Sequence, residues 1–136
     1  MEESEESRLV RRFYDEAWNR WDDDVVDELL ADGFEFRGSL GDEARGRQAW
    51  WRTYRDRVRR AVPDFQNDIV DLVTAPGRAA ARLRYSGHHH GVLLGRQGHG
   101  RLIAYDGAAF LHCAEGRLTS AWVLGDLDAL RGQVDT

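Results

Sequence analysis

The sequence predicts an α+β fold, with helices packed on one face of a curved antiparallel sheet. In the first part of the chain, apolar residues recur every three or four positions, which is the period of an amphipathic helix. After Pro63 the pattern changes to four short runs of β-prone residues. The turn sequences "APGR" (75–78) and "AEGR" (114–117) separate neighbouring runs and indicate antiparallel hairpins.

Three helices are expected before Pro63. The first is predicted by apolar side chains at helical spacing, namely Leu9, Val10, Phe13, Tyr14, Ala17, Trp18 and Trp21. The acidic run 22–24 should cap a shorter second helix that carries Val25, Val26, Leu29 and Leu30. After a candidate strand "FEFRG" (34–38), a third helix should run from about Gln48 until Pro63 stops it. Its apolar side consists of Trp50, Trp51, Tyr54 and Val58.

The β-prone runs are "DIVDLV" (68–73), "RAAARLRYS" (78–86), "RLIAYDGAAFLHC" (101–113) and "RLTSAWVLG" (117–125). A final "DLDALRGQV" (126–134) suits one short helix. The chain contains no internal repeat, low-complexity segment or linker. We therefore expect residues 1–136 to form a single domain, which is long enough to bury a core.

Composition excludes several classes of function. A net charge of -5 argues against nucleic acid or an anionic membrane as the main partner. No run approaches the ~18 apolar residues of a membrane helix. Cys113 is the single cysteine, which excludes a disulfide framework and indicates a reducing cytoplasm.

Several short motifs follow one another in a characteristic order: "PDF" (63–65), "GHHHG" (87–91), "LLG" (93–95), "EGRL" (115–118), Trp122, Asp126 and Gln133. In this order the chain resembles the SnoaL-like polyketide cyclases of the nuclear-transport-factor-2-like superfamily. The resemblance implies a cone-shaped, strongly bent antiparallel sheet, closed by three N-terminal helices around a deep apolar pocket, and often a homodimer. It also implies an apolar, polyketide-like small-molecule substrate, with cyclase, isomerase or lyase chemistry in natural-product biosynthesis.

The chain departs from this family at its proton-transfer positions. Ring-closing members use an aspartate on the last strand as general acid/base, a histidine two residues earlier, and another histidine on the preceding strand. Aligned on "EGRL" and Gln133, these positions hold Val123, Ala121 and Ala109. An aldol closure needs a group that removes a proton and returns one. None of these three side chains can do so.

The alternation of strand side chains sorts the remaining candidates, because successive residues face opposite sides of a sheet. The odd-numbered face, with Ile103, Tyr105 and His89, is expected to line the pocket. The resemblance adds Trp18 and one position of the third helix. The substrate-binding candidates are Trp18, Trp51, Tyr54, Leu83, Tyr85, Ala109, Ala121 and Val123.

His89, Tyr105 and Asp126 are the catalytic candidates. His89 is the only side chain on the pocket face that titrates near neutrality, but it could instead hold a turn by bonding a backbone carbonyl. Tyr105 could donate a proton to a developing oxyanion. Asp126 ends the last strand, yet its place before "LDAL" is equally that of a helix N-cap.

The histidine-rich stretch "SGHHHGVLLGRQGHG" (86–100) raises the question of a metal site. His88 and His90 share a face and could chelate, with His99 or His112 as a third ligand. No additional ligand spacing supports this, and alternation directs His89 to the other face. We therefore expect neither a metal nor another cofactor.

Three functions remain open. A cyclase or isomerase could act by folding a reactive chain into a productive shape, a non-catalytic binding or accessory protein could use the same cavity, and an epoxide hydrolase or hydratase could add water. The last would need a carboxylate–arginine–carboxylate relay; Arg84, Asp106 and Asp126 could supply one, but their parity places them outside the pocket.

Overall fold

The computed structural model describes residues 3–135, so Met1, Glu2 and Thr136 of the expected domain lie outside the described residues. The chain begins with α1 (Glu5–Arg12), which continues as the π-helical segment η1 (Phe13–Trp18) and is followed by α2 (Asp23–Leu29). The Ser4 hydroxyl caps α1 by accepting from the Ser7 amide at 3.1 Å, and the Asp22 carboxylate caps α2 by accepting from the Asp24 amide at 3.0 Å. The first two predicted helices are therefore confirmed.

The third predicted helix is also confirmed. After β1 (Leu30–Arg37) and the short β2 (Glu43–Arg45), the chain is helical through α3 (Arg47–Ala49), the π-helical η2 (Trp50–Arg55) and α4 (Asp56–Ala61). Helical backbone ends before Pro63, whose ring lacks the N–H that another turn would require.

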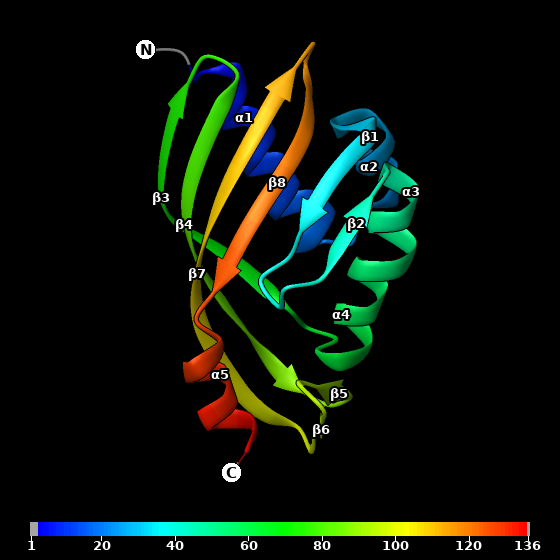
Figure 1. Cartoon of the computed structure of the whole chain (residues 1–136), viewed down its shortest axis with the longest axis vertical. Helices are drawn as coiled ribbons and strands as arrows, with labels where there is room; N and C mark the ends of the chain where they lie inside the picture. The colour runs from blue at the N-terminus through cyan, green and yellow to red at the C-terminus, as the bar shows by residue number, and fades with distance from the viewer. Residues whose placement is uncertain (1–2, 136) are drawn as a thin grey trace.

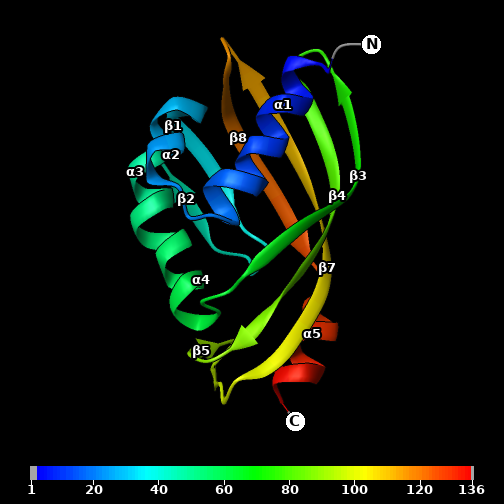
Figure 2. The ribbon, with the colours of Figure 1, turned by 180° about the vertical axis from the view of Figure 1, so that it is seen from behind.

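A strongly curved, open six-stranded sheet follows (Figures 1 and 2), with the strand order β2-β1-β8-β7-β4-β3. Its long strands are β3 (Gln66–Ala75), β4 (Arg78–His89), β7 (Arg101–Ala114) and β8 (Arg117–Gly125). Neighbouring strands are antiparallel with one exception, since β1 pairs with β8 in parallel. Between β4 and β7, the strands β5 (Val92–Leu93) and β6 (Arg96–Gln97) form a separate hairpin.

The helices cover the two faces of the sheet unequally. Figures 1 and 2 show α1 across one face, whereas the final helix α5 (Leu127–Val134) lies against the other face at one end of β7. Gln133 fixes α5 there, because its side-chain amide pairs with the backbone of Ala104 through bonds of 2.7 and 2.8 Å. None of the helices within residues 3–135 is long and apolar enough to cross a membrane.

The alternation of buried and exposed side chains follows the predicted parity. On β4, Leu83 and Tyr85 are buried beneath the helices, while Arg82 and Arg84 are exposed on the other face. The same alternation holds on β7 and β8, where Ala109, Leu111, Ala121 and Val123 are buried. The concave, helix-covered side of the sheet is therefore the side that encloses the core.

Candidate functional site

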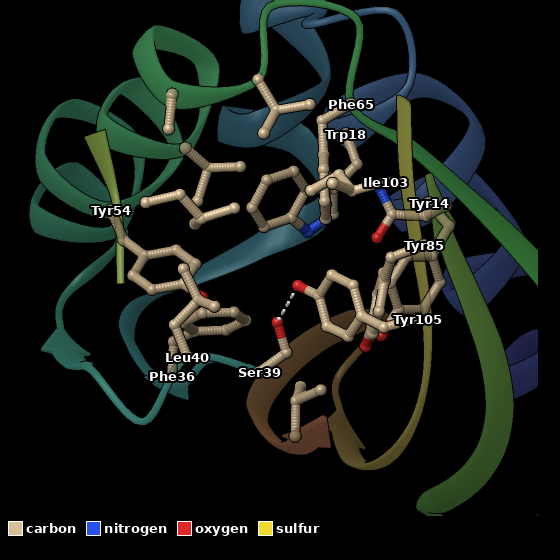
Figure 3. Close-up of a pocket in the computed structure, with 16 residues that line it drawn as sticks. Tyr14, Trp18, Phe36, Ser39, Leu40, Tyr54, Phe65, Tyr85, Ile103 and Tyr105 are labelled. Carbon is tan, nitrogen blue, oxygen red and sulfur yellow. Dashed lines mark hydrogen bonds between the residues drawn. The ribbon is translucent and has the colours of Figure 1, made fainter. Parts of the chain in front are cut away.

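The main candidate site is a cavity between the helices and the covered face of the sheet (Figure 3). Only about 20 Å³ of it is open to the centre of a water molecule, which is room for about one water. A ring-sized ligand would therefore have to displace side chains. The lining consists of Tyr14, Trp18, Phe36, Ser39, Leu40, Tyr54, Val58, Ala61, Val62, Phe65, Asn67, Tyr85, Leu93, Ile103, Tyr105 and Val123.

All four tyrosines of the chain line this cavity. Tyr14 and Tyr54 come from the helices, and Tyr85 and Tyr105 come from β4 and β7. In Figure 3, Tyr54 lies across the cavity from the other three, with Trp18 between the two groups. Segments far apart in the sequence thus bring every phenol of the protein to one place.

Two π-helical segments deliver the helical members of this lining. Tyr14 and Trp18 lie in η1, and Tyr54 lies in η2. In η1 the Asn19 amide bonds the Tyr14 carbonyl, five residues back, at 2.9 Å. Such widened turns occur frequently at functional sites, because the extra residue changes the direction of the side chains around it.

The phenols are held in their neutral form. Burial raises the pKa of Tyr54 to about 12, and burial also raises the pKa values of Tyr14, Tyr85 and Tyr105 well above the usual range. The other three phenols raise the pKa of Tyr85 further, since charge on one would repel charge on another. At neutral pH all four are hydrogen-bond donors and none can act as a base.

Hydrogen bonding within the lining leaves donors free for a ligand. The Tyr105 and Ser39 hydroxyls lie 2.9 Å apart, and either can be the donor (Figure 3). The Tyr14 hydroxyl is buried and has no hydrogen-bond partner among residues 3–135. Asn67 is tied to Asn19, whose Oδ1 accepts from the Asn67 amide at 2.8 Å and from its Nδ2 at 3.2 Å. An unpartnered buried hydroxyl is costly unless something else supplies its bond, so Tyr14 is a candidate ligand contact.

Five of the candidate residues line the cavity: Trp18, Tyr54, Tyr85, Tyr105 and Val123. Leu83, Ala109 and Ala121 are buried in the core but do not line it. Ala121 borders a different groove, on the far side of the sheet. These three have the expected parity, but they lie on parts of the strands that other core side chains cover.

Trp51 also lies outside the cavity, half-buried against another cluster. Its ring centroid is 5.5 Å from the guanidinium carbon of Arg55, whose side chain is 1% exposed. Arg55 donates to Asp23 at 2.6 Å and to the Ala17 carbonyl at 3.2 Å. Trp51 therefore packs on the Arg55 guanidinium, which joins η2 to the first two helices. It does not line the cavity.

His89 is buried at the end of β4 but is absent from the cavity lining, contrary to the expectation. Its Nε2 lies 3.0 Å from the Arg96 carbonyl oxygen. Because a carbonyl only accepts, Nε2 must carry the proton. The β4 strand extends past the cavity, so His89, its last inward side chain, contacts the β5–β6 hairpin. There it bonds a backbone carbonyl, which is the structural role considered for it as the alternative to catalysis.

Asp126 is exposed, and its Oδ1 accepts from the Ala129 amide at 3.1 Å. It is the N-cap of α5 and does not line the cavity. Arg84 and Asp106 form an exposed ion pair of 2.9 Å on the outer face of the sheet. The three residues that a hydrolytic relay would need are therefore outside the cavity, as their parity predicted.

The histidine-rich stretch does not assemble a metal centre in the part of the chain that the structure describes. His88 Nδ1 lies 2.6 Å from an Asp64 carboxylate oxygen, and the His88 and His90 rings are 6.5 Å apart. Within residues 3–135, no three or more His, Cys, Asp or Glu side chains are grouped so that they could hold a metal ion.

Sequence reasoning missed several lining residues. Tyr14 lies at helical spacing with the other apolar residues of the first helix. This spacing predicts that its side chain is buried, but it does not distinguish a core position from a cavity wall. Phe36 lies on a recognised strand, yet its facing could not be assigned without knowing that β1 joins β8. Ser39 and Leu40 occupy a connection between strands, where no periodic signal exists.

Comparisons with known proteins agree with this architecture. The family model of the SnoaL-like polyketide cyclases matches residues 8–134. No curated protein matches the sequence.

Solved structures share the fold at low sequence identity. A SnoaL-like protein from Jannaschia sp. CCS1 has a TM-score of 0.86 at 17% identity, over 100% of this chain and 98% of that chain. TsrD from Streptomyces laurentii has a TM-score of 0.82 at 23% identity, covering 98% of this chain and 97% of its own. A SnoaL-like polyketide cyclase from Agrobacterium tumefaciens has a TM-score of 0.80 at 19% identity, with coverages of 97% and 98%. At these identities the structural likeness shows the fold alone, whereas the family match extends over nearly the whole chain. The chain therefore belongs to the SnoaL-like polyketide cyclase family.

Proposed function

We propose that this protein is a cyclase or isomerase that binds an oxygen-bearing, polyketide-like molecule in the tyrosine-lined cavity. One observation carries the proposal: four neutral phenols meet in an apolar cavity, and among residues 3–135 its lining includes no carboxylate and no imidazole. Membership of the SnoaL-like polyketide cyclase family supports the reaction class.

The walls would select and shape the ligand. Phe36, Phe65 and Trp18 present rings to the space, and aromatic rings favour flat, unsaturated partners. Holding a flexible chain in one folded conformation replaces a search through many conformations, which can supply a large part of the barrier to ring closure. The cavity would therefore act first as a template.

The phenols would act on charge that develops during the reaction. Donors aimed at a carbonyl oxygen stabilise the enolate or alkoxide that forms there, more strongly in a dry site than in water. Tyr14 has an unused hydroxyl, and Tyr105 is oriented by Ser39. Because none of the described lining groups would accept a proton at neutral pH, the proton would leave to water from a carbon that two carbonyl groups already make acidic, and water would return a proton to the alkoxide that ring closure leaves. The protein would stabilise the resulting enolate.

The lack of a base in the described lining also supports a second candidate function, which is ligand binding without catalysis. A cavity with donors but no base is also suited to binding alone, as in an accessory protein that holds a pathway intermediate. Water addition to an epoxide or alkene has less support, because the carboxylates it would need lie outside the cavity.

We also propose that the protein is a cytoplasmic homodimer that pairs through the outer face of the sheet. Phe110, Trp122 and Leu124 are each 45–53% exposed there, and the Phe110 and Trp122 rings lie 6.2 Å apart. Neighbouring exposed apolar side chains on one face of a sheet are the kind of surface that pairs with another protein copy. Arg84 and Asp106 flank it with opposite charges, which two copies related by a two-fold axis could match.

The catalytic proposal is tested with benzoylacetone, an aromatic β-diketone, by following deuterium exchange at its central carbon with NMR. The wild-type protein should accelerate exchange, and Tyr14→Phe or Tyr105→Phe should slow it by up to about 10²–10³-fold, the usual loss for one oxyanion donor. His89→Gln and Asp126→Asn are the controls and should retain the wild-type rate. Binding of the diketone without accelerated exchange would favour the accessory role, and a rate lost only in His89→Gln would restore that histidine as the base.

A further inference from the structure

We infer that the ligand is amphiphilic, and that its anionic end occupies a second groove outside the cavity, between α4 and the β5–β6 hairpin. The inference rests on the proposed ligand binding in the cavity and adds the chemistry of the ligand's other end. It also assigns Leu93 as the side chain that separates the two compartments.

The groove and the cavity share a wall. The groove offers about 290 Å³ to the centres of water-sized molecules and is lined by Leu40, Asp42, Arg57, Val58, Ala61, Val92, Leu93 and Leu94. Four of these also line the cavity: Leu40, Val58, Ala61 and Leu93. A single layer of side chains thus separates a nearly filled cavity from an open groove. A ligand too large for the cavity has this groove as its continuation.

Leu93 is the member of this wall that lies on the shortest strand. It lies on the two-residue strand β5, outside the six-stranded sheet, whereas Val58 and Ala61 belong to α4. The hairpin turns through Leu94 and Gly95, both with positive φ (49° and 77°), a conformation that leucine rarely adopts. Figure 2 shows β5 beside the end of α4. Displacement of the Leu93 side chain alone would join the groove to the cavity and would keep the hydrogen bonds that hold the hairpin to Ala61 and His89.

Arg57 gives the groove its chemistry. Its Nη2 donates to Asp42 at 2.6 Å, and its guanidinium carbon lies 5.9 Å from the centre of the Tyr54 ring. Its other N–H groups have no hydrogen-bond partner among residues 3–135, and the side chain is half exposed. Arg57 and Asp42 are the charged groups among the groove's described lining residues, so the groove has balanced charge and guanidinium N–H groups to spare. Free guanidinium donors recognise carboxylates and similar anions.

The two ends of the ligand are distinguished by a matched pair of fluorescent probes. N-phenyl-1-naphthylamine is neutral, and 1-anilinonaphthalene-8-sulfonate has the same rings with one added sulfonate. The wild-type protein should bind both and should prefer the sulfonate by about fivefold, the size of an exposed ion pair. Arg57→Gln should abolish this preference without changing the affinity for the neutral probe. Arg52→Gln is the control and should retain the preference, because Arg52 is exposed on the preceding segment η2 and does not line the groove.

Stopped-flow measurements of probe association test whether Leu93 separates the groove from the cavity. Leu93→Ala should speed the association of both probes by at least about fivefold, whereas Leu102→Ala, at an exposed position of β7 outside the groove and the cavity, should leave the rates unchanged. Arg57→Gln keeps the proposal testable if Leu93→Ala fails to fold. An unchanged preference in Arg57→Gln, or unchanged rates in a folded Leu93→Ala, would overturn the inference while leaving cavity binding intact. Binding of neither probe would overturn the inference together with the proposed function.

Discussion

Gly38 sets the position of Tyr54, and adding one methyl group there should close the cavity. A Cβ at Gly38 would lie 2.0 Å from the Tyr54 hydroxyl oxygen and 2.1 Å from its Cζ, against 3.4 Å for an ordinary contact. The ring must therefore retreat by about 1.4 Å, the difference between 3.4 and 2.0 Å. Overpacking of this kind costs about 1–3 kcal/mol of stability. Since Tyr54 lines the cavity and only about 20 Å³ is open to water, the displaced ring would fill the remaining space.

Gly33→Ala is the matched control for Gly38→Ala. Gly33 lies on β1, five residues earlier, and a Cβ there would have no atom within 4 Å. Gly33→Ala should change the free energy of unfolding by less than about 1 kcal/mol, and it should bind N-phenyl-1-naphthylamine normally. Gly38→Ala should be destabilised in urea titrations and should bind the probe at least about tenfold more weakly. Adding Tyr54→Leu, which removes both crowded atoms, should recover the lost stability. If Gly38→Ala matched Gly33→Ala in both assays, Tyr54 would not be the wall of the binding site.

Four other measurements address the remaining features. Asp126→Ala should lower the free energy of unfolding in urea by about 0.5–2 kcal/mol through loss of the α5 cap, without changing probe binding; a stable but inactive variant would contradict this. Tyrosine ionises near pH 10 in the unfolded chain, but Tyr54 in the folded chain ionises only near pH 12. Its contribution to stability should therefore be complete below pH 10 and be lost as the pH rises from 10 through 12, and phenolate absorbance before unfolding would refute this. Light scattering should give a dimer that Trp122→Glu converts to a monomer, and a monomeric wild type would remove the dimer. Elemental analysis of untagged protein should find less than about one zinc per ten chains, whereas stoichiometric metal held by His88 and His90 would reverse that expectation.

The helices and long strands could be predicted from the sequence because apolar residues recur at a different spacing in each kind of element. The first helix needs only apolar residues at three- and four-residue steps, and the alternation on β4 separates Leu83 and Tyr85 from Arg82 and Arg84 without any knowledge of the partner strands. The parallel pairing of β1 with β8 could not be predicted in the same way. It joins segments more than eighty residues apart, and neither segment contains a local signal for its neighbour.

The candidate site was predicted less completely, because parity gives the face of a strand and not the position along the cavity. Tyr105 and Val123 share their faces with Ala109 and Ala121, yet only the first pair reaches the open space. His89 has the correct parity as well, but it lies beyond the cavity and meets the hairpin instead. How far the cavity extends along a strand depends on which helical side chains cover it, and that is decided by tertiary packing.

The same geometry limits which reactions this cavity can support. Val123, which the resemblance aligns with the acid/base aspartate of ring-closing relatives, does line the cavity. The polar groups of the lining are the four phenols, the Trp18 indole, Ser39 and Asn67. Hydrolysis and hydration need an activated water, and neutral phenols do not activate one. Enolisation and closure of a β-dicarbonyl chain place the main demand on stabilising a negative oxygen, which donors can meet. Under the proposed function, a lining without a carboxylate would favour substrates whose carbonyl groups already make a carbon–hydrogen bond acidic.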